Sequence, residues 1–308
     1  MKRFLGVLLL TVLSIKISFG ATDYIISELG QGIYYHQGVH EDASAQNIGA
    51  IANVSFVVGN NCVAVIDSGG SYLEGSYLRQ AIKNTTDLPI CYVINTHVHP
   101  DHTFGNAAFK SDNPTFIGHS KLAAAMQARQ TYFDQTFKET LGSAYTGTEF
   151  IAPTQLVETN RPITIDLGNR MLTLTAHSTA HTDHDLTVYD ETTKTLWTGD
   201  LLFIERVPVM DGSINGWIKV MNDMLSLDLN CVIPGHGSPA HSDWQIAIQN
   251  QLHYFSLMRD QIRSIIANLG TIDQATQSVG LTETSNWELF EHYHRRNITA
   301  SFVELEWE

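Results

Sequence analysis

Three histidines and one aspartate lie within six residues of one another, in the stretch Thr-His-Val-His-Pro-Asp-His that contains His97, His99, Asp101 and His102. Imidazole nitrogens and carboxylate oxygens are ligands that zinc accepts in catalytic sites. His97 and His99 are two residues apart, so on an extended backbone their side chains point the same way. The proline stops a strand or helix from continuing, so Asp101 and His102 lie on a turn or in the first turn of a helix. This segment can therefore offer ligands to two points in space; the alternative is a chance cluster on a surface loop.

Three further candidate ligands occur later in the chain. His181 lies in Ala-His-Thr-Asp-His, Asp200 in Thr-Gly-Asp-Leu-Leu and His236 in Pro-Gly-His-Gly. Asp200 and His236 each follow an apolar run and a glycine, which allows a close approach of the backbone. Taken singly, each could be a solvated turn residue. Taken with the first stretch, in this order and spacing, they predict a metal centre.

Apolar runs bounded by turn residues predict the elements that must position these ligands. Strands are expected at residues 24–26, 33–35, 51–58, 62–66, 89–95, 163–166, 171–175, 186–189 and 195–198. Helices are expected at 72–83, 104–108, 121–137 and 243–269, and the polar stretch 145–161 is expected to form a loop over the site. This order favours an α/β layered fold, in which chemistry is placed at the carboxyl ends of strands.

The N-terminus has the composition of a secretory signal peptide. Lys2 and Arg3 precede an apolar run over residues 4–13, which is too short to span a membrane, and small residues follow. We expect cleavage after Gly20 or Ala21 and a periplasmic protein; the alternative is a buried N-terminal strand or helix. No later stretch is long and apolar enough to cross a bilayer.

Acidic residues outnumber basic ones. The 308 residues include 18 Lys and Arg against 32 Asp and Glu, a formal net charge of −14. Loss of residues 1–20 would remove three basic residues and no acidic ones, which leaves 15 against 32 and a net charge near −17. Such a surface is a poor partner for a polyanion, so nucleic acid is not expected.

The three cysteines, Cys62, Cys91 and Cys231, lie among apolar residues. An odd number excludes full pairing within one chain, and none has the spacing of a metal cluster. Small buried core residues are the simpler interpretation, and a disulfide between Cys62 and Cys91 stays open.

The order of the candidate ligands resembles that of the metallo-β-lactamase-fold hydrolases. That family carries His-x-His-x-Asp-His, then a histidine in a His-Thr segment, a Gly-Asp and a Gly-His, and all four are present here. The resemblance implies an α/β, four-layer αββα sandwich with two metal ions at one edge of the sheets. We expect a signal peptide at 1–20, this domain at 21–269, and a short C-terminal helical extension, 270–308, packed on the domain.

The resemblance also assigns roles to single residues. It implies a first zinc bound by His97, His99 and His181, a second bound by Asp101, His102 and His236, and a bridging ligand, Asp200. Asp67 would orient metal-bound histidines without binding metal. Two zinc ions hold a bridging water as hydroxide near neutral pH, and one zinc polarises the substrate carbonyl that the hydroxide attacks. Asp101 would orient this nucleophile and carry its proton to the leaving group.

Single positions separate the subgroups of this family. His99 stands where flavodiiron oxidoreductases carry glutamate, which argues against iron redox chemistry. Asp200 stands where the best-known zinc β-lactamases carry cysteine, so the site is more similar to glyoxalase II and lactonases. His184 stands where many relatives carry glycine and could line the site or reach a metal. His177 is expected to be a strand residue or to support a metal ligand.

A closer resemblance, to the quinoprotein relay system zinc metallohydrolases, covers nearly the whole chain after residue 20. The similar segments are residues 198–203, 206–208, 211–213, 216–217, 234–237, 293–299 and 304–308. These relatives are exported proteins associated with quinoprotein dehydrogenase systems. The resemblance does not supply a natural substrate.

Together these expectations describe an exported zinc-dependent metallohydrolase, with two Zn²⁺ per chain, that cleaves a small-molecule ester, thioester, lactone or lactam. One alternative is β-lactam hydrolysis specifically. Another is a non-catalytic accessory protein that binds zinc or a quinone for a quinoprotein dehydrogenase system. Arg206, Trp217 and Lys219 lie between Asp200 and His236, on a segment expected to border the site. A packed tryptophan with two solvated cations is the favoured interpretation; the alternative is that they grip an anionic or aromatic substrate.

Overall fold

The computed structural model describes residues 14–19 and 22–308. The predicted signal peptide, residues 1–20, and its cleavage sites lie outside the described residues, apart from strand β1 (Ser14–Phe19). This strand pairs antiparallel with β2 (Thr22–Gly30) at the edge of the first sheet. The fold does not test cleavage, which stays a prediction.

Eight strands form the first sheet, in the spatial order β1 to β8. After β2 these strands are β3 (Ile33–His36), β4 (Val54–Val58), β5 (Val63–Ile66), β6 (Ile90–Ile94), β7 (Thr115–His119) and β8 (Gln155–Val157). From β5 to β8 neighbouring strands run parallel. All four residues of β5 are buried, because both faces of a sheet of this kind are covered.

Five strands form the second sheet, in the order β13-β12-β11-β10-β9. They are β9 (Ile163–Asp166), β10 (Met171–Ala176), β11 (Leu186–Asp190), β12 (Thr195–Phe203) and β13 (Cys231–His236). Along β10, Leu172, Leu174 and Ala176 are buried and the residues between them are not, which is the two-residue period of a strand. Only β12 and β13 run parallel in this sheet.

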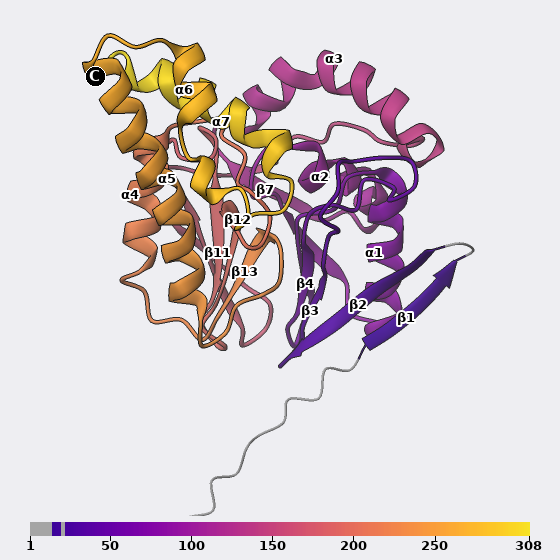
Figure 1. The fold of residues 1–308 in the computed structure, drawn as a ribbon. Helices are drawn as coiled ribbons and strands as arrows, with labels where there is room; N and C mark the ends of the chain where they lie inside the picture. The colour runs from indigo at the N-terminus through magenta and orange to yellow at the C-terminus, as the bar shows by residue number, and fades with distance from the viewer. Residues whose placement is uncertain (1–13, 20–21) are drawn as a thin grey trace, which may run out of the picture.

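Helices cover the outer face of each sheet (Figure 1). The helix α1 (Tyr72–Thr85) and the 3₁₀ helix η1 (Phe104–Asp112) pack on the first sheet. The helices α4 (Ile214–Met224) and α5 (Trp244–Ala267) pack on the second. The layers therefore follow the order helix, sheet, sheet, helix, which confirms the predicted four-layer α/β fold.

The two sheets are held together by an apolar core between them. Ile66 and Ile94 of the first sheet join one buried cluster with Leu174, Val188 and Trp197 of the second. Burying a side chain of this size contributes about 1.5–3 kcal/mol. This core fixes the two sheets face to face, so that their strand ends meet along one edge.

The chain after α5 packs on the second sheet's helices. It forms α6 (Ile272–Ser278), the 3₁₀ helix η3 (Leu281–Glu283) and α7 (Phe290–Leu305). Ile298 and Phe302 of α7 are buried in the same cluster as Trp217 and Phe255. The C-terminal segment thus shares a core with the sandwich.

Some elements differ from the sequence prediction. The stretch 145–161 contains β8, which pairs with β7, a non-local contact that local polarity does not reveal. This stretch does not line the site; the helix α3 (Leu122–Leu141) does. Residues 104–108 belong to a 3₁₀ helix rather than an α-helix. The helix α4 was not predicted, although its buried residues have helical spacing.

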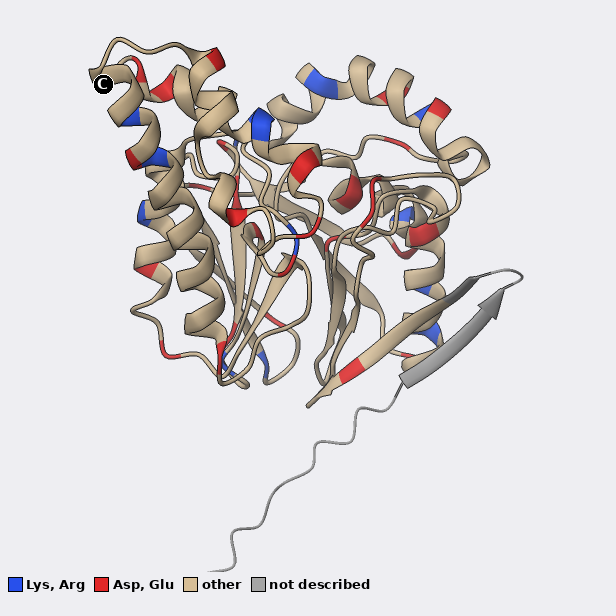
Figure 2. Cartoon of the chain, viewed as in Figure 1, with Lys and Arg blue, Asp and Glu red and all other residues tan. Residues whose placement is uncertain are grey.

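Acidic and basic positions are spread over both halves of the molecule (Figure 2). Basic positions on α3 and on α7 lie at the same end of the sandwich, where Figure 1 shows these two helices above the sheet edges. Among the described residues, no helix combines the length and the hydropathy that crossing a bilayer requires.

Candidate metal centre

The candidate ligands gather at one edge of the two sheets, at or near the carboxyl ends of β6, β10, β12 and β13. His97 and its neighbours follow β6, and the short helix α2 (Pro100–Thr103) carries Asp101 and His102. Asp200 lies in β12, His236 ends β13, and His181 lies in the connection from β10 to β11. Because parallel neighbours end at the same edge of a sheet, elements far apart in sequence meet here.

The first group of ligands comprises His97, His99, His181 and Asp200. The Nδ1 atom of His99 lies 3.0 Å from Nε2 of His97 and 3.1 Å from Nε2 of His181. Ligand atoms around one tetrahedral zinc ion, bound at 2.0–2.1 Å, are about 3.3 Å apart. The three imidazole nitrogens therefore converge as the ligands of one metal ion would.

The second group comprises Asp101, His102 and His236. The Oδ2 atom of Asp101 lies 3.4 Å from Nε2 of His236 and 3.7 Å from Nε2 of His102. All three residues direct one ligand atom toward a common point. Their mixture of imidazole and carboxylate donors suits zinc.

Asp200 offers one carboxylate oxygen to each group. Its Oδ2 lies 3.6 Å from Nε2 of His97 and 3.5 Å from Nε2 of His181. Its Oδ1 lies 3.1 Å from Nε2 of His102 and 3.4 Å from Nε2 of His236. The 3.1 Å contact between Oδ1 of Asp200 and Nε2 of His102 lacks hydrogen-bond geometry, so both buried atoms are without a hydrogen-bond partner among the described residues. Orphaned polar atoms of this kind are costly unless a ligand satisfies them, so the residues fit a pair of metal ions.

A second set of contacts orients the ligand rings. Asp67 directly follows β5; its carboxylate accepts hydrogen bonds from Nδ1 of His102 and from both the backbone N–H and Oγ1 of Thr96, each at 2.8 Å. The Nδ1 atom of His181 donates to the carbonyl of Val209 at 2.8 Å. Such partners fix the tautomer that leaves the metal-facing nitrogen free to bind.

The glycines that precede Asp200 and His236 are required because other atoms lie close to their backbones. A Cβ atom on Gly235 would lie 2.0 Å from Oδ1 of Asp200. A Cβ atom on Gly199 would lie 2.6 Å from Oγ1 of Thr96, and Gly199 has φ of +50°. The sequence prediction that these glycines permit close packing of β12, β13 and the metal centre is confirmed.

Burial and charge set the protonation of the ligands. Burial lowers the pKa of His181 to about 3 and lowers that of His97 well below its usual value, so both rings are neutral. Burial raises the pKa of Asp101, but His102 and His236 outweigh this and lower it overall. Burial lowers the pKa of His102, yet Asp200, Asp67 and Asp101 together raise it well above its usual value. The three carboxylates thus stabilise a proton on His102, and a bound metal cation would take the place of that proton.

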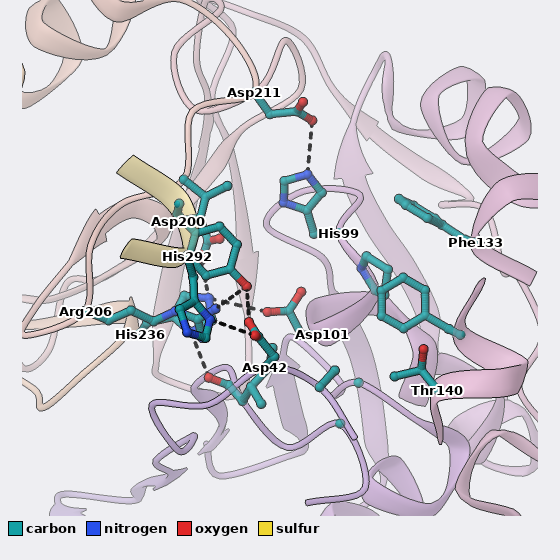
Figure 3. A pocket seen from close by; sticks show the side chains of 18 of the residues that line it. Asp42, His99, Asp101, Phe133, Thr140, Asp200, Arg206, Asp211, His236 and His292 are labelled. Atoms are coloured by element: carbon teal, nitrogen blue, oxygen red, sulfur yellow. Dashed lines mark hydrogen bonds and ion pairs between the residues drawn. The ribbon is translucent and has the colours of Figure 1, made fainter. Parts of the chain in front are cut away.

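A cavity of about 680 Å³ opens directly onto the two groups. Its lining includes His99, Asp101, Asp200 and His236 from the metal centre. Figure 3 shows Asp101 in the middle of this cavity, with Phe133 and Thr140 on the side opposite Arg206 and His236. A substrate in the cavity would therefore contact both metal-binding groups.

Other residues singled out from sequence lie elsewhere. Trp217 is fully buried on α4, where its Nε1 donates to the Leu201 carbonyl, and it packs behind the His181 ring. Lys219 is exposed, pairs with Asp223 and does not line the cavity, which agrees with the favoured interpretation of a solvated cation. Arg206 does line the cavity.

The two extra histidines do not line the cavity. His184 is buried beside Thr182, whose Oγ1 lies 2.8 Å from its Nδ1. The Nε2 atom of His177 lies 2.9 Å from Oγ1 of Thr187, in a separate hollow on the outer face of the second sheet. Neither belongs to the two groups that could hold a metal ion.

Several cavity residues were not predicted from sequence. They are Asp42 from the loop after β3, Arg129, Phe133 and Phe137 from α3, Asp211 from the segment before α4, and His292, Tyr293 and Arg296 from α7. Each belongs to a stretch whose local pattern is explained by helix packing or a turn. These residues meet because α3, α7 and the two loops that carry Asp42 and Asp211 all lie over the strand ends in the folded protein.

Comparison with known proteins agrees with this geometry. Residues 48–236 match the family model of the metallo-beta-lactamase superfamily. The fold is similar to that of the metallo-β-lactamase of Pontibacter korlensis, with a TM-score of 0.59 and 16% identity over 75% of this chain and 98% of that one. It is also similar to TMB-1 (TM-score 0.58, 16% identity, 75% and 96% covered) and to DIM-1 (TM-score 0.59, 15% identity, 75% and 95% covered). With its two sheets, its paired metal-binding groups and this match over more than half its length, the chain belongs to the metallo-beta-lactamase superfamily.

Proposed function

We propose that this protein is a binuclear zinc hydrolase that cleaves an ester, thioester, lactone or lactam. The observation that carries the proposal is the position of Asp200, which turns one carboxylate oxygen to each of two ligand groups. The imidazole-rich donor set favours zinc over magnesium or calcium, which prefer oxygen ligands.

The roles of the chain's own residues follow from their positions. Two bound zinc ions would supply a water of lowered pKa and a Lewis acid for the substrate carbonyl. Asp101 belongs to the second ligand group and also lines the cavity, so it can hold the attacking water and pass its proton to the leaving group. The other ligands and Asp67 keep this geometry fixed.

A simple experiment tests hydrolysis. The purified protein is loaded with zinc and assayed with an ester, a thioester, a lactone and a cephalosporin, each with and without a chelator. Turnover that the chelator abolishes and zinc restores supports the proposal. Loaded protein that turns over none of these substrates contradicts it and favours the accessory role.

β-Lactam hydrolysis is the narrower candidate. Two of the structurally similar proteins are named as metallo-β-lactamases, but at 15–16% identity this likeness concerns the fold. Asp200 replaces the cysteine of the best-known zinc β-lactamases, so we expect the ester, thioester or lactone to be turned over faster than the cephalosporin.

We also propose that the protein is exported to the periplasm and acts beside a quinoprotein dehydrogenase system. The proposal rests on the N-terminal composition and on the C-terminal segments that resemble the relay-system proteins. Mass spectrometry of the protein from a periplasmic fraction tests it: an N-terminus at residue 21 or 22 is expected, and an intact Met1 contradicts export by cleavage.

A further inference from the structure

We propose that Arg129 and Arg296 form an anion-binding subsite, which selects carbonyl substrates that carry a carboxylate several bonds from the reacting carbonyl. This inference rests on the proposed function, because it places that carbonyl at the metal-binding groups. The two arginines come from α3 and α7, and both line the cavity.

The two guanidinium groups meet at one carboxylate. Nη2 of Arg129 lies 3.3 Å from Oδ2 of Asp211, and Nη2 of Arg296 lies 3.4 Å from Oδ1 of the same side chain. Oδ2 of Asp211 also accepts a hydrogen bond from Nε2 of His99, at 3.1 Å. Asp211 therefore links the two arginines to a ligand of the first metal-binding group.

This arrangement leaves positive charge and hydrogen-bond donors unused. A guanidinium has five N–H donors in a planar fork, which matches a carboxylate in bidentate fashion. Within the described part of the chain, Arg129 and Arg296 each make a single long ion pair, and both to Asp211. Two cations facing one anion leave one surplus positive charge, which a substrate carboxylate would neutralise.

The third arginine of the cavity is almost closed off from solvent. Arg206 is 3% exposed, and its guanidinium donates to the carbonyl of Glu41 and to the hydroxyl of Tyr293, although its Nε has no hydrogen-bond partner among the described residues. It lies at the second ligand group, beside His236. The arginines that a substrate can reach more easily are therefore Arg129 and Arg296, at the first group.

The position of the two arginines sets the distance between the carboxylate and the reacting carbonyl of the substrate. One imidazole ring and one carboxylate separate the guanidinium groups from the metal-facing nitrogen of His99. Phe133 and Phe137 of α3 line the cavity on the same helix as Arg129. The substrate class is thus an acid whose apolar chain or ring connects its carboxylate to the reacting carbonyl.

The expected selectivity is modest and sensitive to salt. The side chains of Arg129 and Arg296 are 33% and 56% exposed, so solvent screens their charge. In a protein of net charge −14, this local positive charge still favours entry of an anion over a neutral analogue. We expect a preference of about tenfold, or about 1.4 kcal/mol, at low ionic strength.

A matched pair of zinc-binding thiols tests the subsite without requiring turnover. Zinc-loaded protein is titrated calorimetrically with 6-mercaptohexanoate and with 6-methylheptane-1-thiol, in which a branched alkyl group replaces the carboxylate. The variants are Arg129→Met, Arg296→Met and the matched control Arg259→Met, whose arginine pairs with Asp260 on α5 and does not line the cavity. We expect the acid to bind about tenfold tighter to the wild-type protein and to the control. Each of the other two variants should lose most of this preference.

Equal binding of the two thiols to the wild-type protein would overturn the subsite, as would an unchanged preference in both Arg129→Met and Arg296→Met. Hydrolysis of mono-4-nitrophenyl adipate and 4-nitrophenyl 6-methylheptanoate is measured in parallel. The ratio of their kcat/KM values should follow the thiol preference. If neither ester is turned over while the acid thiol is still preferred, the hydrolase proposal fails and the subsite stands.

Discussion

At the level of single residues, the metal centre is ordered by the groups behind the ligands. The ring nitrogen of His236 that faces away from the site donates to the carbonyl of Ile51 at 2.7 Å, and His181 is held likewise by Val209. His102 and His99 donate to the carboxylates of Asp67 and Asp211. A ring whose outward nitrogen donates in this way turns the lone pair of its other nitrogen toward the metal site without rearrangement.

The Asp67→Asn substitution should weaken zinc binding about 10–100-fold, because the amide cannot accept all three hydrogen bonds that the Asp67 carboxylate accepts. The loss should concern the second zinc ion, since Asp67 orients His102. Competition with a chelator of known affinity measures the effect.

The control for Asp67 is Asp112→Asn, which removes a carboxylate that pairs with Arg79 and Lys83 away from the cavity. Its zinc affinity should match that of the wild-type protein. Wild-type affinity in Asp67→Asn itself would mean that this carboxylate does not orient a ligand.

The seven candidate ligands were predictable because their types and spacing carry the chemistry locally. Asp101 and His102 follow a proline, and Asp200 and His236 follow glycines that only close packing explains. Asp211 and Arg296 lie in segments that carry the closer resemblance, but their types and spacing give no local signal of a place in the cavity. Their place at the cavity depends on how α7 lies over the strand ends, which no short stretch of sequence determines.

At the level of elements, α7 holds the N-terminus of α4 in place. The carboxylate of Glu304 accepts hydrogen bonds from the backbone N–H of Ile214 and the hydroxyl of Ser213, at 2.7 and 2.8 Å. These contacts satisfy donors that a helix start leaves free, and they place negative charge at the positive end of the helix.

Glu304→Ala should therefore lower the free energy of unfolding by about 2 kcal/mol, since it removes several hydrogen bonds to a charged group. Urea denaturation of the zinc-free protein measures the loss. Glu306→Ala, at an exposed neighbour whose side chain makes no hydrogen bond or ion pair in the described structure, is the control and should change stability by less than about 0.5 kcal/mol. A Glu304→Ala protein as stable as this control would show that the contact contributes nothing.

His177, which follows β10, should make the zinc-free protein sensitive to acid. Burial lowers the pKa of His177 to about 4, whereas in the unfolded chain it is near 6.5. As the pH falls from 6.5 to 4, the unfolded chain binds a proton that the folded protein excludes, so stability is lost in this window. Between pH 7 and pH 4, we expect the free energy of unfolding of His177→Gln to fall by about 2 kcal/mol less than that of the wild-type protein. An identical pH profile for the two proteins would contradict this.

Element predictions succeeded where the pattern was local and failed where it was not. The helix expected at 243–269 has its buried residues on one helical face, and it is present as α5. The strand β8 has three residues and exists because β7 offers an open edge. The helix α3 lines the site in place of the loop expected at residues 145–161, and its position depends on packing of Phe133 against Phe104.

At the level of the whole molecule, each metal-binding group draws its ligands from both sheets. Ligands that follow β6 come from one sheet, and those on β12, β13 and the β10–β11 connection come from the other. The apolar core between the sheets fixes the distance between these two sets of ligands, and Asp200 of β12 faces both metal-binding groups. The sequence order alone could not supply this distance.

The zinc content of the wild-type protein and of Asp200→Ala tests the central claim most directly. Protein saturated with zinc and then dialysed is analysed by mass spectrometry of the metal, with Asp223→Ala as a control that removes an exposed carboxylate. We expect about two zinc ions per chain in the wild-type protein and the control, because each ligand group would hold one ion. Asp200→Ala should hold about one ion or fewer, with hydrolysis reduced at least about 100-fold. One zinc or none in the wild-type protein, or two in Asp200→Ala, would contradict the bridged binuclear centre.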